Sequence, residues 1–299
     1  MKQIDINGRL VACAQEVEAE LATYMENEDK DIKEIFDAEA YSLLGGGKRI
    51  RPYLVMAFCE MLGGTREKAF PLASALEMIH TYSLIHDDLP CMDDDEYRRG
   101  RLTNHKVFGE ATAVLAGDAL LTKAFEVVSA TTVLSAEEKV AAIVILSQAA
   151  GDRGMIGGQI MDMAAETSAE NLDRSYLIKM HGLKTGALIK AAAKLGCVAA
   201  GRHKENKVVL AASEYAEKIG LAFQVIDDIL DVTGDAATLG KNVGVDGEQN
   251  KLTFMNFYSV AEAKSYADAL TEEAIKAITS FDKDGELAAL ATYLLNRTH

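Results

Sequence analysis

Residues 178–200 read IKMHGLKTGALIKAAAKLGCVAA, a stretch in which apolar and small residues cover most of the circumference of a helix. A helix of this composition is expected to pack among other helices rather than to lie on the surface. The rest of the chain is similar, because proline occurs only three times and Ala, Leu, Met, Glu and Lys fill the long intervals between breakers. Repeated alternating strand patterns are missing. The sequence therefore predicts an all-α protein.

Proline and capping residues locate the helix ends. Pro52 and Pro71 suit the first turn of a helix, whereas Pro90 excludes the residue before it from helical geometry and ends a helix. Ser135 and Glu138 form a capping box. Because no linker, repeat or low-complexity tract interrupts the pattern, residues 1–299 are expected to form a single domain. The predicted helices lie at about residues 9–27, 31–44, 51–62, 71–88, 105–130, 135–163, 171–199 and 204–233, with two more after residue 253.

Composition and charge exclude several classes of protein. With 49% hydrophobic residues among 299, the chain can bury about 75% of its unfolded surface, so disorder is excluded. Its 31 basic and 46 acidic side chains give a net charge of −15, which opposes binding to a nucleic acid backbone. The four cysteines form no Cys-x-x-Cys pair and are expected to be reduced. The sequence lacks a signal-like or membrane-spanning apolar run, which favours a cytoplasmic location.

The densest cluster of charge is residues 87–96, DDLPCMDDDE, which Arg98, Arg99 and Arg101 follow. A charge run of this kind is usually a solvated loop. Here, however, it ends an apolar helix, and the carboxyl end of a helix favours a nearby cation. A calcium-binding EF-hand loop is excluded, because its sixth position, counted from Asp93, is Arg98 instead of glycine. The run is therefore a candidate site for another metal ion.

A second acidic group, residues 227–231 (DDILD), ends another apolar stretch. Asp227 and Asp231 share one helix face with Gln224, and like charges four residues apart weaken a helix unless a cation compensates. Magnesium suits the pattern, because it takes one or two carboxylates and completes its coordination with water and phosphate oxygens. The two acidic helix ends are expected to face each other across a cavity.

Basic residues are grouped as well. Residues 45–52 read GGGKRIRP and place three cations between a loop and a helix, where free backbone amides can also meet phosphate. Three glycines alone more often mark a helix end and a turn. Lys184 and Lys241 lie near other breaks, and His80 shares a helix face with Asp87, although a lone histidine is more often a core residue. Acidic clusters that can hold a metal ion, next to basic clusters that can hold phosphate oxygens, indicate a site for a metal-chelated diphosphate.

Several of these motifs occur together in one order along the chain. They are residues 46–52 (GGKRIRP), the paired aspartates 87–88 with Asp93 and residues 98–100 (RRG), residues 157–159 (GGQ), residues 184–188 (KTGAL) and residues 223–231 (FQVIDDILD). This set resembles the trans-isoprenyl diphosphate synthases. The four residues between the paired and the third aspartate are similar to those of bacterial farnesyl diphosphate synthases, or geranyltranstransferases. The resemblance runs from about residue 45 to residue 254.

The resemblance implies a helical bundle of the isoprenoid synthase type around a deep central cavity, assembled as a homodimer. It implies a head-to-tail (1'-4) prenyl transfer, in which dimethylallyl or geranyl diphosphate condenses with isopentenyl diphosphate and pyrophosphate is released. Farnesyl diphosphate (C15) is the expected product, with geranyl and geranylgeranyl diphosphates as alternatives. Such chemistry needs no protein nucleophile, in agreement with the absence of a Ser-His-Asp or Cys-His signature.

The same resemblance implies which residues of this sequence form the site. Three Mg²⁺ ions are implied, with the metal ligands Asp87, Asp88, Asp93, Asp227 and Asp231. The allylic diphosphate would contact Arg98, Lys184, Thr185, Gln224 and Lys241, and isopentenyl diphosphate would contact Lys48, Arg51, His80 and Arg99. The implied catalytic residues are Asp87, Asp88, Asp93, Arg98, Lys184, Asp227 and Lys241. Asp88 and Asp228 can also act by orienting the other groups.

Tyr82 and Ser83 are expected to form the floor of the cavity. They precede Asp87 by five and four residues, which is about 6–7.5 Å along a helix. In the family, bulk at these positions stops chain growth, and Tyr82 beside a small Ser83 resembles the C15-forming arrangement.

Two other functions share part of the pattern. A terpene cyclase has the fold and the first acidic motif, but it usually carries an Asn/Ser/Glu metal triad in place of the second. A regulatory subunit of a heteromeric synthase tends to lack one acidic motif, and both are present here. The chain departs from the family at residues 251–255 (KLTFM), where Lys-Ser/Thr-Thr-Tyr-Pro is usual, and at Leu102, where proline is common. It ends in Arg297-Thr298-His299, where relatives often end in lysine.

Overall fold

A computed structural model describes residues 4–166, 172–233 and 251–297 of the chain. The helices are α1 (Ile6–Thr23), α2 (Lys33–Leu43), α3 (Ile50–Met61), α4 (Arg66–Asp87), α5 (Asn104–Phe108), α6 (Glu110–Ala130), α7 (Ala136–Ala150), α8 (Met155–Glu166), α9 (Arg174–Lys184), α10 (Gly186–Ala199), α11 (Asn206–Thr233), α14 (Val260–Ile278), α15 (Glu286–Leu295) and the 3₁₀ helix η2 (Phe254–Asn256). A hairpin of two-residue strands, β1 (Tyr97–Arg98) and β2 (Arg101–Leu102), completes the described elements. The prediction of an all-α protein is confirmed.

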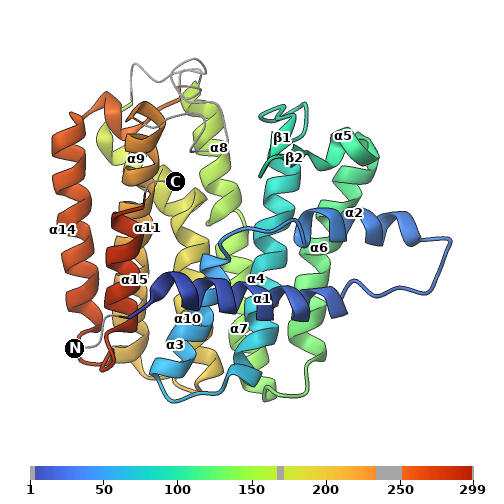
Figure 1. The fold of residues 1–299 in the computed structure, drawn as a ribbon, viewed down its shortest axis with the longest axis horizontal. Coiled ribbons are helices and arrows are strands. Elements are labelled where there is room, and N and C mark those ends of the chain that lie inside the picture. The colour runs from blue at the N-terminus through green and yellow to red at the C-terminus, as the bar shows by residue number, and fades with distance from the viewer. Residues whose placement is uncertain (1–3, 167–171, 234–250, 298–299) are drawn as a thin grey trace.

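The stretch at residues 178–200 lies in the middle of the bundle, as its composition predicts. Its second half, α10, packs against α3, α4, α7, α9 and α11, and Leu188, Ala192 and Leu195 are buried. Figure 1 shows α4, α6, α8, α11 and α14 running roughly parallel, with α1 and α2 lying across the bundle. Within the described residues, no helix is long and apolar enough to span a membrane.

Three predicted helices are each divided in two, and glycine explains two of the breaks. The helix predicted at 105–130 is interrupted at Gly109, whose φ of 85° is left-handed and separates α5 from α6. The helix predicted at 135–163 ends at Gly151, which is extended, and restarts as α8 at Met155. The helix predicted at 171–199 breaks at Thr185, between α9 and α10. Hydrophobic periodicity continues across these breaks, so it does not reveal them.

The capping and proline predictions have mixed outcomes. Ser135 and Glu138 form the expected capping box, with each side chain accepting a hydrogen bond from the other's backbone amide. Pro52 lies in the first turn of α3, as predicted. The placement of Pro71 is wrong, because α4 already begins at Arg66 and Pro71 lies in its second turn. The start at Arg66 adds one turn that apolar periodicity does not indicate.

Buried apolar residues form two clusters. The larger cluster, here called the first core, joins α1, α2, α3, α4, α6, α7, α10, the first half of α11 and α15, with the start of α8 and the end of α14. The second core joins α8, α9, the second half of α11, η2 and α14. The first acidic motif follows α4 in the first core, and the second acidic motif lies on α11 in the second core. The two motifs therefore lie beside different apolar cores.

Candidate active site

A cavity of about 480 Å³ opens beside the end of α4. Its walls are mostly apolar, and α8 contributes Met155, Ile156, Ile160 and Met163 to them. Gln159 of the GGQ motif also lines it. Seven residues predicted for the site line this one cavity, namely Arg51, His80, Tyr82, Ser83, Asp87, Lys184 and Thr185. Metal, diphosphate and floor residues from α3, α4 and the α9–α10 junction therefore meet in one place.

The loop after α4 brings Asp93 back to Asp87. Its turn is closed by the backbone amide of Asp93, which donates to the Asp87 carbonyl oxygen at 2.9 Å. Burial raises the pKa of Asp87 to about 6, with Lys184 acting against this and the nearby Asp93 adding to it. Two carboxylates held together and partly removed from water favour a bound cation.

Lys184 lines the same cavity as Asp87. Its Nζ donates to Asp162 of α8 at 2.5 Å. Burial alone would lower the pKa of Lys184, but Asp162, together with Asp87 and Asp93, raises it, so the ammonium stays charged. A Cβ atom on Gly158 would lie 2.1 Å from the backbone nitrogen of Lys184, which shows why α8 needs glycine where it crosses this junction. Sequence reasoning left Asp162 without a role, although it lies three residues after the GGQ motif.

Asp88 is held away from solvent by an arginine. It is 3% exposed, and Arg98 of β1 donates from Nε to its Oδ1 at 2.6 Å. Burial raises the pKa of Asp88 while the Arg98 contact opposes the rise. Arg98 and Arg99 line a smaller hollow beneath the hairpin, next to Asp88. The hairpin therefore carries both predicted arginines to the cavity end of α4.

The second acidic motif is tied to the end of the chain. Asp227 forms an ion pair with Arg297 at 2.7 Å, and Arg297 also donates to the Phe223 carbonyl oxygen and lies over the Phe223 ring. Asp228 accepts a hydrogen bond from the backbone amide of Phe254 at 2.7 Å. Asp231 is buried and Gln224 is half-buried. The contacts of Arg297 and Phe254 were missed, because no local spacing connects these residues with α11.

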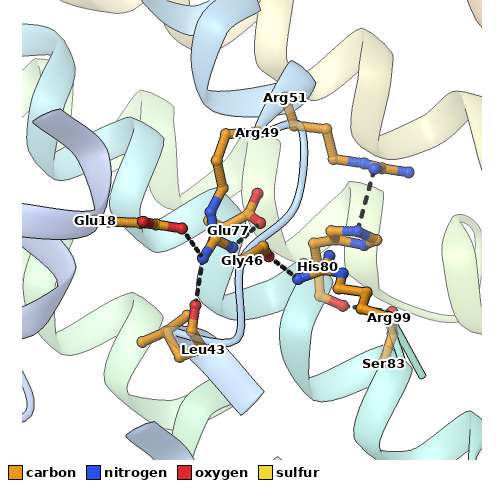
Figure 2. A network of polar contacts seen from close by, with 9 residues as sticks. All are labelled: Glu18, Leu43, Gly46, Arg49, Arg51, Glu77, His80, Ser83 and Arg99. Atoms are coloured by element: carbon orange, nitrogen blue, oxygen red, sulfur yellow. Dashed lines mark hydrogen bonds and ion pairs between the residues drawn. The ribbon is translucent and has the colours of Figure 1, made fainter. Parts of the chain in front are cut away.

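The residues predicted for isopentenyl diphosphate are only partly brought together. Arg51 and His80 line the cavity, whereas Arg99 lines the hollow beneath the hairpin and Lys48 lines another hollow with Arg297. Arg51 Nη1 lies 3.3 Å from His80 Nε2 (Figure 2). Burial, followed by Arg51 and the other nearby arginines, lowers the pKa of His80 well below its ordinary value, so a neutral ring can accept from Arg51. Asp227 acts on the charges of both Arg51 and Lys48. Arg51 thus lines the cavity beside Asp87, whereas, within the described residues, no aspartate of the second motif lines it.

The donor set suits magnesium, because Asp87 and Asp93 offer carboxylate oxygens beside groups that attract phosphate. Within residues 4–166, 172–233 and 251–297, no three acidic, histidine or cysteine side chains are arranged as a ready metal site. The predicted residue Lys241 lies outside the described residues.

Comparison with known proteins assigns the family. A family model described as polyprenyl synthetase matches residues 32–294. The chain belongs to the polyprenyl synthetase family. It is accordingly a prenyltransferase that elongates prenyl chains, and the resemblance inferred from its motifs is confirmed.

Relatives of this polyprenyl synthetase differ in the product they are named for. A farnesyl diphosphate synthase of Haemophilus influenzae is 43% identical over 287 residues, covering 95% of this chain and 97% of the relative. A geranylgeranyl diphosphate synthase of Cyanophora paradoxa is 46% identical over 269 residues, covering 89% and 88%. A Helicobacter pylori geranyltransferase structure, complexed with magnesium and isoprenyl diphosphate, superposes with a TM-score of 0.84 at 34% identity, covering 99% of this chain and 97% of that one.

Proposed function

We propose that the enzyme condenses dimethylallyl or geranyl diphosphate with isopentenyl diphosphate in a head-to-tail (1'-4) reaction and forms farnesyl diphosphate (C15). The observation that carries the proposal is the single cavity that has Asp87, Lys184 and Thr185 at its charged end and Tyr82 and Ser83 on α4 below them. A polar end for a diphosphate and an apolar pocket of limited depth are what a chain-elongating enzyme needs.

The reaction requires charge stabilisation on one substrate and positioning of the other. Lys184 and Arg98 donate to the diphosphate as the allylic C–O bond breaks, in a setting that is partly shielded from water. Arg51 and His80 hold isopentenyl diphosphate so that its double bond lies close to the allylic C1. A carbon–carbon bond forms there, and the proton that the new cation loses passes to the released pyrophosphate. The apolar wall of α8 excludes water from the cation.

Divalent metal completes this site. We assign Mg²⁺, three ions per site, to the carboxylates Asp87, Asp88, Asp93, Asp227 and Asp231. When bound, the ions would neutralise charge that develops on the leaving diphosphate. The Helicobacter pylori geranyltransferase, whose structure is complexed with magnesium, supports the use of a divalent cation by this enzyme.

A product assay tests the reaction directly. Purified enzyme is given Mg²⁺ with dimethylallyl and isopentenyl diphosphates, and the dephosphorylated products are sized by chromatography. We expect mainly C15, and a C20 product would instead support the geranylgeranyl alternative that the Cyanophora paradoxa relative represents. Incubation with the allylic diphosphate alone is the control for a terpene cyclase, which needs no isopentenyl partner. Failure to elongate at all would overturn the proposal.

Two floor variants test the product length. Tyr82 is buried, its hydroxyl has no hydrogen-bond partner, and its ring meets that of His86 edge-on. Tyr82→Ala removes this bulk and should lengthen the product beyond C15, whereas Ser83→Phe should shorten it toward C10. Ser83→Ala is the matched control and should keep the parent distribution. Parent-like products from both Tyr82→Ala and Ser83→Phe would reject the floor assignment.

We also propose that the enzyme works as a homodimer. Val107 on α5 and Val114 and Leu115 on α6 are 43%, 40% and 58% exposed, and large apolar side chains exposed together favour association. Light scattering during gel filtration measures the mass, and a monomeric mass of 32.3 kDa at working concentration would contradict the dimer. The expected cytoplasmic location and the expected absence of a nucleic acid partner stay predictions.

A further inference from the structure

The glycine-rich loop before α3 has an unusual backbone. Gly46 and Gly47 have φ angles of 82° and 125°, and Arg49, which is not a glycine, has a φ of 48°. A side chain in the left-handed region is unfavourable and persists only where the surrounding structure holds it. Arg49 lies directly after Lys48 and two residues before Arg51, both of which are assigned to isopentenyl diphosphate. The contacts that hold Arg49 in this conformation therefore also orient Lys48 and Arg51.

The side chain of Arg49 supplies that restraint. Its guanidinium is 0% exposed and donates to Glu77 of α4 at 2.6 Å and to the Leu43 carbonyl oxygen at the end of α2 at 2.6 Å. A longer contact of 3.2 Å reaches Glu18 of α1. Figure 2 shows the guanidinium enclosed by these three groups. One buried side chain thus fixes the loop to three helices, in a geometry that only the planar fork of arginine provides.

Glu77 also influences the other arginines near the loop, Arg51 and Arg99. It precedes His80 by three residues on α4, so the two lie one above the other on the helix. Among the neighbouring charges, Glu77 contributes most to keeping both Arg51 and Arg99 protonated against burial. Arg99 in turn donates to the Gly46 carbonyl oxygen of the same loop. Glu77 therefore binds Arg49 directly and acts on Arg51 and Arg99 through its charge.

We propose that Arg49 and Glu77 form a positioning pair for the isopentenyl diphosphate end of the site. Neither residue contacts the substrate. Arg49 holds the loop that presents Lys48 and Arg51, and Glu77 offsets the repulsion among Arg49, Arg51 and Arg99. The inference rests on the proposed function, because that function assigns this end of the site to isopentenyl diphosphate.

Glu77→Gln is the first test, because it keeps the shape of the side chain and removes its charge. We expect KM for isopentenyl diphosphate to rise about 10–100-fold, as when an outer partner of a binding group is lost, while KM for geranyl diphosphate changes less than about twofold. The matched control is Glu18→Gln, which alters the same arginine's contact to a 37% exposed carboxylate and should leave both KM values unchanged. Equal rises in both KM values, or a parent-like KM for isopentenyl diphosphate, would overturn the proposal.

A double variant separates positioning from stability. A buried ion pair replaced by apolar residues of similar size often leaves a protein as stable as before. Arg49→Met combined with Glu77→Met should therefore keep the parent Tm, whereas KM for isopentenyl diphosphate should stay raised because Arg51 and Arg99 lack their carboxylate. Recovery of the parent KM in this variant would show that the pair serves stability alone and would overturn the proposal.

Binding without turnover keeps this test independent of the reaction. Calorimetric titration with inorganic pyrophosphate is done in EDTA, which leaves the aspartates without metal, so that binding depends on the cationic residues. Glu77→Gln should weaken pyrophosphate binding at least fivefold relative to Glu18→Gln. Equal affinities in the two variants would reject the positioning pair, even if the parent enzyme elongates prenyl chains normally. A parent that binds pyrophosphate but makes no prenyl product would contradict only the proposed function.

Discussion

The acidic motif that follows α4 and the one on α11 have the same pattern of paired aspartates, and in both the second aspartate is buried. Asp88 is 3% exposed and is bound by Arg98, while Asp228 is 4% exposed and accepts from the amide of Phe254. The first aspartates differ. Asp87 lines the cavity, whereas Asp227, with its side chain 35% exposed, is paired with Arg297.

The comparison indicates that the first aspartate of each pair is the main ligand position, whereas the second is held by a protein donor and can offer less to a metal ion. A buried carboxylate with a fixed donor holds the loop or segment that donates to it. The aspartate before it is then available to a ligand or, in the second motif, to the end of the chain. The four predictions below test this division, beginning with the largest expected effect.

Replacing Asp87 should affect catalysis most. Asp87→Asn removes a charge that would bind metal at the cavity and should lower kcat about 10²–10³-fold, as when one preorganised charge-stabilising group is lost. Asp88→Asn weakens the contact to Arg98 and should lower kcat only about tenfold, as for an orienting partner. Steady-state kinetics with saturating Mg²⁺ measures both. Asp94→Asn, in the same loop and already at a positive φ of 51° that asparagine tolerates, is the control. Equal losses for Asp87→Asn and Asp88→Asn would refute the division of roles.

Asp87 should also make the metal-free protein less stable as the pH rises. Burial raises the pKa of this carboxyl from 3.8 to about 6, so the folded protein binds the proton more tightly than the unfolded chain. Stability should therefore fall between about pH 4 and pH 6 and level off above, by at most roughly 3 kcal/mol. Urea unfolding in EDTA measures the slope, and Asp87→Asn should remove this part of it. An identical slope in parent and variant would show that Asp87 is not the group responsible.

The sequence predicted the parts of the fold and site that depend on local pattern. The central position of α10 and the capping box at Ser135 both follow from the pattern within one segment. The helix breaks at Gly109 and Thr185 did not follow, because apolar periodicity continues through them. In the site, too, contacts between residues that are far apart in the sequence were not predicted.

Partners that are distant in the chain could not be predicted from spacing. Arg98 follows Asp88 by ten residues in the same motif, so their proximity was within reach of sequence reasoning. Arg297 and Asp227 are 70 positions apart, and only the packing of Arg297 against α11 brings them together. The buried pair of Arg49 and Glu77 joins a loop to a helix in the same way.

Removing the Asp228 carboxylate should destabilise the second core. Asp228→Ala leaves the buried amide of Phe254 without its acceptor, which should lower the free energy of unfolding by about 1–3 kcal/mol. Phe254 is fully buried and stacks on the ring of His181 in α9, so loss of its anchor should loosen the contact between η2 and α9. Thermal unfolding measures the change. Asp228→Asn is the matched control, since its amide oxygen can still accept, and a loss as large as that of the alanine variant would contradict this explanation.

The smallest expected effect concerns Arg297, which makes the second motif differ from the first. Arg297→Gln removes the ion pair with the partly exposed Asp227 and should lower the free energy of unfolding by only about 1 kcal/mol. The positive charge of Arg297 also opposes a metal ion at the same carboxylate, so its removal should tighten binding of Mn²⁺ in the presence of pyrophosphate by a few fold. Electron paramagnetic resonance of free Mn²⁺ measures the affinity, and Arg297→Lys, which keeps the charge, should resemble the parent. Weaker Mn²⁺ binding by Arg297→Gln would instead show that the chain's end supports the metal site, and Arg297 would then have the same supporting role as Arg98.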